Sequence, residues 1–307
     1  MNNLKICFVI LHYMNIDETQ KCVTSIISSQ GNSKIHIVIV DNGSTNGSGK
    51  TLLNNYKDNE KVTVIQSTEN LGFARGNNIG YHFALSLKPE YVAVINSDTE
   101  ILQKDFVNCV DNIYSRTHFD VLGPDIINLQ GKHQNPMRLE PLTDDQLLDI
   151  EKNRESVLKH INRFCVQNNL KEKLRNIALL RRIKNIVKPY RDINAIDYRK
   201  EYINPVLHGS CYIFSKKYMT FREEAFNPKT FLFFEEDILY DECLEKGLKL
   251  VYSPLIRIKH HEDGSTDYIY KKNKEKIKFI YTNQLASIKV LKEIRANEEL
   301  YAKKNKT

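Results

Sequence analysis

The sequence lacks the cysteine patterns that mark zinc-binding and disulfide-rich proteins. Its six cysteines stand at positions 7, 22, 109, 165, 211 and 243, and none of them forms a Cys-x-x-Cys pair. A zinc ribbon or zinc knuckle is therefore not expected. Cysteines this sparse in a chain of 307 residues also argue against a disulfide framework, and they favour a reducing, cytoplasmic compartment.

Long apolar runs are absent as well. The longest one near the N-terminus, Ile6–Leu11, is far shorter than the roughly 20 residues that a helix needs to cross a bilayer. It also lacks the small-residue cleavage site of a signal peptide. No later segment is long enough either, so a membrane-spanning helix is not expected.

Composition and charge indicate a globular protein whose two halves differ electrically. Hydrophobic residues make up 41% of the chain and charged residues 27%, which is ordinary for a protein that buries a core and excludes disorder of the whole chain. Residues 1–140 hold 12 Lys and Arg against 14 Asp and Glu, whereas the remainder holds 33 against 24. The second half therefore carries the groups that attract anions.

The first 100 residues alternate between strand and helix patterns. Short, apolar, β-branched stretches typical of buried strands occur at Ile6–Leu11, Ile35–Val40, Val62–Ile65 and Tyr91–Ile95. Between them, Thr19–Ser29 and Asn77–Leu87 place apolar side chains on one helical face. This alternation predicts an α/β fold with a mostly parallel sheet that helices cover on both faces.

Three polar clusters follow three of the predicted strands. They are Asp41-Asn42-Gly43-Ser44, the segment from Asn70 to Asn78, and Asn96-Ser97-Asp98. Ligands of open α/β sheets bind beyond the carboxyl ends of the strands. We therefore expect these three segments to converge on one ligand site.

Residues 140–200 interrupt the pattern and read as a helical, basic insertion. Residues 163–191 hold nine Lys and Arg against one acid, Glu172, and apolar side chains recur there every three or four positions. One interpretation is a solvated helical insertion packed on the domain. The other is a basic helix that docks on anionic lipid or a phosphorylated substrate.

Residues 204–267 return to a compact pattern. The sequence predicts a strand at Phe231–Phe234, a helix at Ile238–Lys246 with Gly247 as its left-handed cap, and two strands, Leu250–Tyr252 and Ile256–Ile258, split by Pro254. Residues 271–307 hold eleven Lys and Arg against four Glu. They predict a helix that frays into a basic tail.

A glycine-rich stretch follows the second predicted strand. Gly43–Thr51 resembles a phosphate-binding P-loop, whose pattern is Gly-x-x-x-x-Gly-Lys-[Ser/Thr]. Counting back from Gly49, however, places Ser44 where the first glycine is required. A flexible turn is the simpler interpretation, and a P-loop nucleotide hydrolase is the alternative.

Three other motifs each allow a structural and a chemical interpretation. Asn96-Ser97-Asp98 offers hard oxygen ligands for Mg²⁺ or Mn²⁺, although a polar helix cap has the same composition. Glu235-Glu236-Asp237 supplies a general base or simply an acidic first turn. His260 and His261 follow a strand and point to opposite faces, so at most one reaches the site.

The ordered set of motifs resembles a known family. A strand ending in His12-Tyr13 is followed by Asp41-Asn42-Gly43-Ser44, then by Asn70-x-Gly72-Phe73-Ala74-x-Gly76-Asn77-Asn78, by Asn96-Ser97-Asp98, by Gly209-Ser210, by Glu235-Glu236-Asp237 and by His260. This order is similar to that of family 2 inverting glycosyltransferases with a GT-A fold. It is closest to rhamnosyltransferase-like enzymes of bacterial surface polysaccharide and capsule assembly. The resemblance covers about residues 4–267 outside 140–200.

The resemblance implies a nucleotide-sugar site. Asp41, with His12 and the backbone near Tyr13, would hold the base and ribose of a UDP- or dTDP-sugar. Asn70, Gly72 and Arg75 would line the nucleotide pocket, with Arg75 able to meet the diphosphate.

The resemblance also implies a divalent metal, Mg²⁺ or Mn²⁺, beside the diphosphate. Asp98 would close the metal-binding Asp-x-Asp motif, in which Asn96 stands at the first position and Ser97 between, and His260 would face metal or diphosphate.

The remaining roles implied by the resemblance lie on the acceptor side. Asp237 aligns with the general base and Glu236 with its acidic neighbour, but three acids in a row leave the register open by one residue. Gly209 and Ser210 would lie beside the acceptor, which is a glycan or a lipid-linked glycan.

The expected organisation is a GT-A catalytic domain at 1–270 followed by a basic helix and tail at 271–307. Within the domain, residues 1–125 would bind the nucleotide sugar, 140–200 would form the basic insertion, and 201–270 would carry the acceptor and catalytic half. The expected location is cytoplasmic, peripheral at the anionic inner face of the membrane. Nucleic acid is not an expected partner, since no recognition motif or aromatic stacking pattern occurs. A non-catalytic nucleotide- or glycan-binding protein on the same fold is a further alternative.

Overall fold

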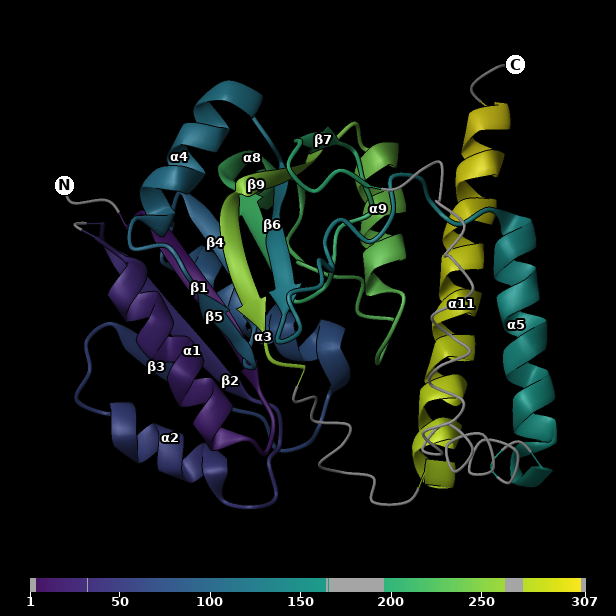
Figure 1. The fold of residues 1–307 in the computed structure, drawn as a ribbon, viewed down its shortest axis with the longest axis horizontal. Helices are drawn as coiled ribbons and strands as arrows, with labels where there is room; N and C mark the ends of the chain where they lie inside the picture. Colours follow the sequence, from purple (N-terminus) through teal and green to yellow (C-terminus); the bar gives the residue numbers. More distant parts are fainter. Residues whose placement is uncertain (1–3, 32, 164, 166–195, 263–272, 305–307) are drawn as a thin grey trace, which may run out of the picture.

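The computed structural model describes residues 4–31, 33–163, 165, 196–262 and 273–304. Within them the chain forms a central sheet with helices on both faces, and a pair of long helices stands beside it (Figure 1). The helix predicted within residues 163–191 lies almost wholly outside the described residues, so its two interpretations stay predictions.

The first four strands form the parallel half of the sheet. They are β1 (Ile6–His12), β2 (Ile35–Asp41), β3 (Val62–Gln66) and β4 (Tyr91–Asn96), and they confirm the four predicted strands. Their order is β3-β2-β1-β4, and all three pairings are parallel. Leu11 of β1 lies opposite both Val40 and Asn96. The ends of β1, β2 and β4 therefore meet at one edge, as the polar clusters predicted.

The second half of the sheet is mixed. Its strands are β8 (Cys211–Ser215), β6 (Val121–Asn128), β9 (Leu250–His260) and β5 (Thr99–Ile101), in that order from β4, and β7 (Tyr202–Ile203) also pairs with β9. Strand β8 runs antiparallel to both of its neighbours, while β6 and β9 are parallel. This arrangement brings the end of β9 back to the edge where β4 ends.

Alternating side chains of the strands build a core on each face. Ile6, Phe8 and Ile10 of β1 belong to one buried cluster with α1 (Ile16–Ser29), α2 (Ser48–Tyr56) and α4 (Phe106–Thr117). Cys7 and Val9 belong to the other, with α3 (Gly72–Ser86), α8 (Lys216–Phe221) and α9 (Glu235–Glu245). The period-2 alternation of a strand explains this division.

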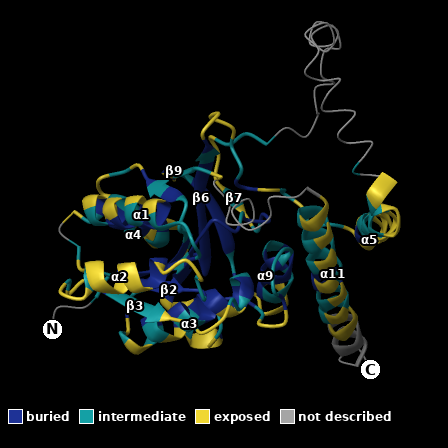
Figure 2. Cartoon of the chain, turned by 90° about the horizontal axis from the view of Figure 1, so that it is seen from below, coloured by how far each residue is buried: buried dark blue, intermediate teal, exposed yellow. Residues whose placement is uncertain are grey.

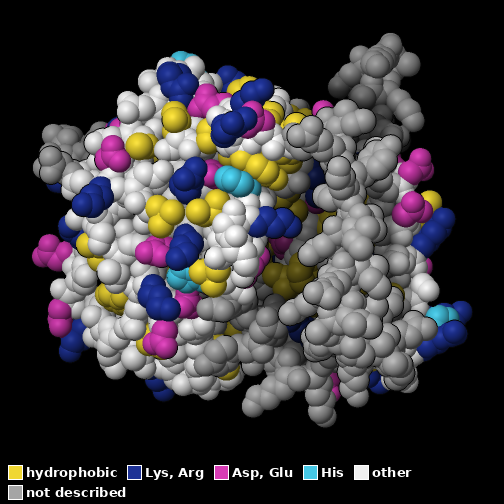
Figure 3. Space-filling model, viewed as in Figure 1, with side chains coloured by type: hydrophobic (Ala, Val, Ile, Leu, Met, Phe, Trp, Pro, Cys, Tyr) yellow, Lys and Arg dark blue, Asp and Glu magenta, His cyan; other side chains and the backbone are white. Residues whose placement is uncertain are grey.

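Helices α5 (Asp144–Lys159) and α11 (Asn273–Lys304) pack against each other beside α9 (Figures 1 and 2). Leu147 of α5, Ile238 of α9 and Leu291 of α11 form a small buried cluster between them. Arg295 of α11 connects the three helices, because its guanidinium bonds to Asp241 of α9 and to Asp144 of α5. In the view of Figure 3, the visible Lys and Arg side chains are interspersed with acidic ones rather than gathered in one patch.

Two strand predictions in the second half are wrong. Phe231–Phe234 is irregular, with φ of 75° at Phe233 and 63° at Phe234. Its carbonyls bond to other elements instead of a ladder, since Phe231 accepts from the Phe73 amide and Leu232 accepts from the Ser287 hydroxyl. The chain at 250–260 forms one continuous strand, because the pairing with β6 shifts register between Pro124 and Asp125 and so accommodates Pro254.

The helix predicted at Ile238–Lys246 is present as α9, which begins earlier, at Glu235. Gly247 follows it with φ of 62°, as the predicted left-handed cap. The three acids therefore occupy the first turn of α9, where the helix dipole stabilises negative charge.

Candidate functional site

The end of β2 is held to the start of α3 by one buried amide. Asn42 donates from Nδ2 to Asn70 Oδ1 at 3.0 Å and to the Gly72 carbonyl at 3.1 Å, and its Oδ1 accepts from the Leu71 amide at 2.9 Å. Asp41, 3% exposed, accepts from the Ser44 amide at 3.1 Å. Two of the three predicted segments are thus bonded directly to each other.

The turn into α3 requires glycine at position 72. Gly72 has φ of 79°, and a Cβ there would overlap the carbonyl group of Phe231. This close approach places the 231–234 loop against the start of α3. Arg75, in the first turn of α3, is exposed, so its guanidinium is free to reach beyond the protein surface.

The side chain of His12 is fully buried at the end of β1. Its ring nitrogens lie 2.7 Å from the Thr19 hydroxyl and 2.8 Å from the Ser48 hydroxyl. Burial lowers the pKa of His12 to about 4, so the ring is a neutral link between α1 and α2. Tyr13, the next residue, is partly exposed at the strand end. The imidazole of His12 therefore holds α1 and α2 at the end of β1.

Asp98 lies against His260. Their carboxylate oxygen and Nε2 are 3.4 Å apart, and the two side chains are only 13% and 11% exposed. His261 bonds through its backbone amide to the Asp98 carbonyl, while its ring lies 2.5 Å from the Glu18 carboxylate. Only one of the two adjacent histidines faces the Asp98 side chain, as alternation along the strand predicted.

The Asp98–His260 pair fits a divalent cation. Gln134 Oε1 lies 2.9 Å from His260 Nδ1 and can only accept there, so Nδ1 carries a hydrogen and Nε2 is the ring nitrogen that faces Asp98. The separation of 3.4 Å is a few tenths of an ångström longer than the roughly 3.0 Å between adjacent ligands of an octahedral ion bound at about 2.1 Å, so small side-chain shifts would bring both groups onto one ion. Within the described ranges, no three His, Cys, Asp or Glu side chains are placed to share an ion. The other ligands would therefore come from phosphate oxygens, water and the partly exposed Asn96-Ser97 turn.

The acidic turn of α9 presents three different carboxyl groups. Glu236 accepts a hydrogen bond from the Gly209 amide, and a Cβ on Gly209 would lie 2.6 Å from Glu236 Oε1. Asp237 is 4% exposed and is ion-paired with Arg138. Glu235 is 5% exposed. Glu236 is thus the partly exposed member of the three.

Burial raises the pKa of all three carboxyl groups. Burial and the neighbouring Glu236 carboxylate raise the pKa of Glu235 to about 8. Burial also raises the pKa of Glu236 and of Asp237, and the Arg138 guanidinium opposes the rise in both. Near pH 7, Glu235 is therefore largely protonated.

The 208–210 segment connects the acidic turn with the end of β4. The Asn96 amide donates to the Ser210 carbonyl at 2.9 Å, and Gly209 contacts Glu236. The same short segment therefore contacts both His260, through the ring of His208, and Glu236, through Gly209. Sequence reasoning found Gly209 and Ser210, and it quoted Asn42 within a motif without giving it a role. It missed Arg138 and His208. His208 directly precedes a quoted motif, whereas nothing local marks Arg138.

The glycine-rich stretch after β2 does not form a phosphate cradle. Gly49 packs against the Asp41 side chain so closely that a Cβ would overlap it, the Ser48 hydroxyl lies against His12, and Lys50 is exposed.

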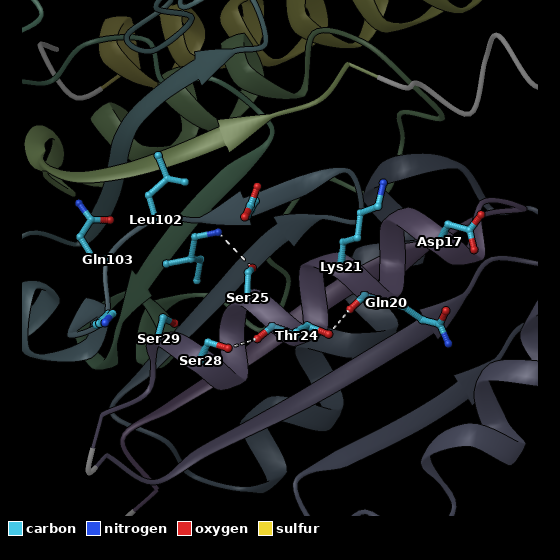
Figure 4. A pocket seen from close by; sticks show the side chains of 12 residues that line it. Asp17, Gln20, Lys21, Thr24, Ser25, Ser28, Ser29, Leu102 and Gln103 are labelled. Carbon is cyan, nitrogen blue, oxygen red and sulfur yellow. Dashed lines mark hydrogen bonds between the residues drawn. The ribbon is translucent and has the colours of Figure 1, made fainter.

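A surface groove of about 750 Å³ lies elsewhere, between α1 and β5 (Figure 4). On its wall, the Ser25 hydroxyl accepts a hydrogen bond from the Ile101 amide. Its lining includes none of the strand-end residues above.

In the part of the chain that the structure describes, no helix has the length and apolar character needed to cross a membrane.

Known proteins share both sequence and fold with this chain. Over 95 residues it is 32% identical to the low-salt glycan biosynthesis hexosyltransferase Agl10 of Haloferax volcanii, which covers 31% of this chain and 29% of that protein. TarS of S. aureus, solved in complex with UDP, superimposes with a TM-score of 0.51 at 13% identity, covering 86% of this chain and 62% of TarS.

A second solved structure, GalNAc-T7 with UDP, GalNAc and Mn²⁺, superimposes with a TM-score of 0.54 at 16% identity, covering 85% of this chain and 44% of GalNAc-T7. The chain thus spans less than two thirds of each of these proteins. The two structural matches show that the fold is the GT-A fold that the sequence predicted. A family model described as Glycosyl transferase family 2 matches residues 7–185, more than half of the chain. The chain therefore belongs to glycosyl transferase family 2.

Proposed function

We propose that the protein transfers a sugar from a nucleotide-diphosphate donor, a UDP- or dTDP-sugar, to a glycan or lipid-linked glycan, with inversion at the anomeric carbon. The observation that carries this proposal is that one short segment, residues 208–210, contacts both the Asp98–His260 pair, through His208, and Glu236, through Gly209. A leaving diphosphate needs positive charge, and an attacking hydroxyl needs a base. The segment thus connects a group suited to each task, and inversion is the outcome we propose for a base that acts opposite the leaving group.

The donor is the part of the proposal with most external support. TarS was solved with UDP, and GalNAc-T7 with UDP, and Agl10 is named a hexosyltransferase. In this chain, Asp41 and the backbone at Tyr13 would contact the base and ribose, and Asn70 and Gly72 would line the pocket. Arg75 is exposed and would approach the diphosphate. Transfer of a hexosyl or rhamnosyl group in surface polysaccharide assembly is the biological role we infer.

We assign the general base to Glu236 rather than to Asp237. Asp237 is buried and already neutralised by Arg138, so its carboxylate is held by the protein. Glu236 is partly exposed and is oriented by the Gly209 amide. Burial raises its pKa, which strengthens it as a proton acceptor. Glu235 beside it has a pKa of about 8 and is largely protonated near pH 7, so it adds little negative charge next to Glu236.

Asp98 and His260 would hold Mg²⁺ or Mn²⁺ at the diphosphate. When bound, the ion would supply positive charge that stabilises the leaving group. The residues of the chain would orient the reacting groups: Gln134 fixes the ring of His260, and the 208–210 segment aligns Glu236. The Phe231–Phe234 loop, bonded to α3 and α11, holds the first turn of α9 in place.

We further propose that the protein works at an anionic membrane surface, where lipid-linked glycans are available. The support is the excess of 33 Lys and Arg over 24 Asp and Glu after residue 140. Each such charge near an anionic surface contributes about 1 kcal/mol. Co-sedimentation with anionic liposomes at low salt tests this. Failure to bind would exclude membrane docking without affecting the proposed chemistry.

The transfer itself is tested by incubating the enzyme with UDP-hexoses or dTDP-rhamnose, Mn²⁺ and candidate glycans. Release of UDP or dTDP and the anomeric configuration of the product are then followed by NMR. We expect turnover by the wild type, a product with inverted configuration, and loss of turnover in Asp98→Ala. A retained configuration would exclude the base assigned to Glu236.

A further inference from the structure

His208 lies between the two halves of the candidate site. It directly precedes Gly209, whose amide bonds to Glu236, and its ring packs edge-to-face against His260 with centroids 5.7 Å apart. The Asp98–His260 pair and Glu236 therefore flank it. In the chemistry proposed above, the diphosphate is on the first side and the acceptor hydroxyl is on the second. The part of the substrate that joins them is the transferred sugar.

The backbone of His208 is held by a fully buried neighbour. Its amide donates to Asn135 Oδ1 at 2.9 Å, and Asn135 Nδ2 donates to the Pro124 carbonyl at 2.6 Å. Asn135 is fully buried. The backbone of His208 is thus linked through Asn135 to the middle of β6.

Hydrogen bonds to the ring define which nitrogen carries the proton. The Ser210 amide donates to His208 Nδ1 at 3.2 Å, and the Ser210 hydroxyl lies 2.9 Å from the same atom. A nitrogen that accepts from an amide carries no hydrogen, so the ring hydrogen is on Nε2. Nε2 makes no hydrogen bond with the described residues and is not among the buried polar atoms that lack a partner. It is therefore a donor directed at solvent.

We propose that His208 contacts the donor substrate, with its Nε2–H donating a hydrogen bond to a hydroxyl oxygen of the transferred sugar. The inference rests on the proposed function and deepens it, because it names a residue that recognises the sugar rather than the nucleotide. A sugar hydroxyl accepts such a bond from a neutral ring without any change in protonation. The contact would hold the anomeric carbon between the leaving group and Glu236.

Two substitutions separate the two ring nitrogens. The amide of asparagine reaches the position of Nδ1 and can still accept from Ser210, so His208→Asn removes only the Nε2 donor. The amide of glutamine reaches the position of Nε2 and can still donate there, so His208→Gln keeps the proposed contact. Melting temperatures of both variants establish that each is folded.

The experiment measures UDP affinity and kcat/KM for a UDP-hexose in the wild type and both variants. We expect equal UDP affinity in all three, a fall in kcat/KM of roughly 10- to 100-fold in His208→Asn, and substantial recovery in His208→Gln. Donors that lack one hydroxyl identify the partner, because one of them should be a poor substrate for the wild type but no poorer for His208→Asn.

Three results would overturn the inference: unchanged kcat/KM in His208→Asn, no recovery in a folded His208→Gln, or an equal loss of affinity for UDP itself, which would place the contact on the diphosphate. A wild type that neither binds nor turns over any nucleotide sugar would instead remove the proposed function, and the inference with it.

Discussion

The guanidinium of Arg138 is paired with the carboxylate of Asp237, across 99 positions of sequence. This ion pair distinguishes the two acids that the sequence left as candidates for the base. Asp237 is buried with its partner, whereas Glu236, one residue earlier, remains partly exposed beside Gly209. The proposal that Glu236 is the base rests on this difference, and the contact behind it is not marked by any local motif.

Replacement of Glu236 by Gln should abolish transfer while leaving the fold and the donor site intact. A general base typically contributes 10²- to 10⁴-fold, so we expect kcat to fall by roughly that factor in Glu236→Gln. Its affinity for the donor nucleotide should stay unchanged. Steady-state kinetics together with nucleotide binding checks both expectations.

Asp237→Asn is the matched control for that substitution. It leaves the Arg138 guanidinium without its charged partner, so we expect lower stability, by roughly 3 kcal/mol, and a smaller loss of kcat than in Glu236→Gln. The reverse order, with Asp237→Asn inactive and Glu236→Gln active, would return the role of base to Asp237.

Glu235 should make the protein less stable as pH rises. Its pKa is about 8 in the folded state, above the ordinary value for glutamate, so the folded protein binds its proton more tightly than the unfolded chain. The resulting stabilisation is fully present below about pH 4.5 and is lost as pH rises through about 8, by at most about 1.4 kcal/mol per pH unit. Urea unfolding of wild type and Glu235→Gln from pH 5 to pH 8 isolates this contribution. Parallel pH profiles for the two proteins would contradict it.

Asn42 should be essential to the nucleotide side of the site. In Asn42→Asp, a carboxylate oxygen replaces the amide that donates to Asn70 and Gly72, and three acceptors then face one another. We expect a loss of stability of about 3 kcal/mol and weaker nucleotide binding. Asn54→Asp, at an exposed position of α2, adds the same charge and should change neither quantity. Similar behaviour of the two variants would contradict the role given to Asn42.

Lys50 should be dispensable. It is exposed on α2, and the glycines before it form no phosphate cradle. Lys50→Ala should therefore bind nucleotide and turn over donor within about twofold of the wild type, since substitutions of exposed residues outside a site are usually near neutral. Loss of nucleotide binding in this variant would favour the P-loop alternative.

The sequence was sufficient for the parallel half of the fold and for the edge of the sheet at which the predicted segments lie. The strands β1 to β4 are short and rich in β-branched residues, and β1, β2 and β4 are almost wholly buried, so local pattern and tertiary structure agree in them. The polar clusters at their ends had to converge, because parallel neighbours end at the same edge of the sheet.

The errors arose where long-range contacts override local preference. Phe231–Phe234 has the composition of a strand, but α3 and α11 bond to its carbonyls and Phe233 and Phe234 take positive φ. Long-range contacts also determine the surroundings of His12, since both of its ring nitrogens lie against hydroxyls of α1 and α2; its place at the nucleotide stays a prediction. Arg138 and Asn135 act through partners distant in sequence, and no spacing rule identifies such residues in a single chain.

The central claim, that the strand ends form a metal-assisted site for a nucleotide-sugar donor, is tested most directly by thermal stability. The melting temperatures of wild type and Asp98→Ala are measured with UDP, dTDP, GDP, CDP and ATP, each with Mn²⁺ or with a chelator. A ligand at 100 times its dissociation constant adds about 2.7 kcal/mol of stability. We predict that UDP or dTDP raises the melting temperature of the wild type only with Mn²⁺, and that Asp98→Ala loses this effect. Stabilisation by ATP alone, or stabilisation by UDP that persists in Asp98→Ala and with chelator, would contradict the claim.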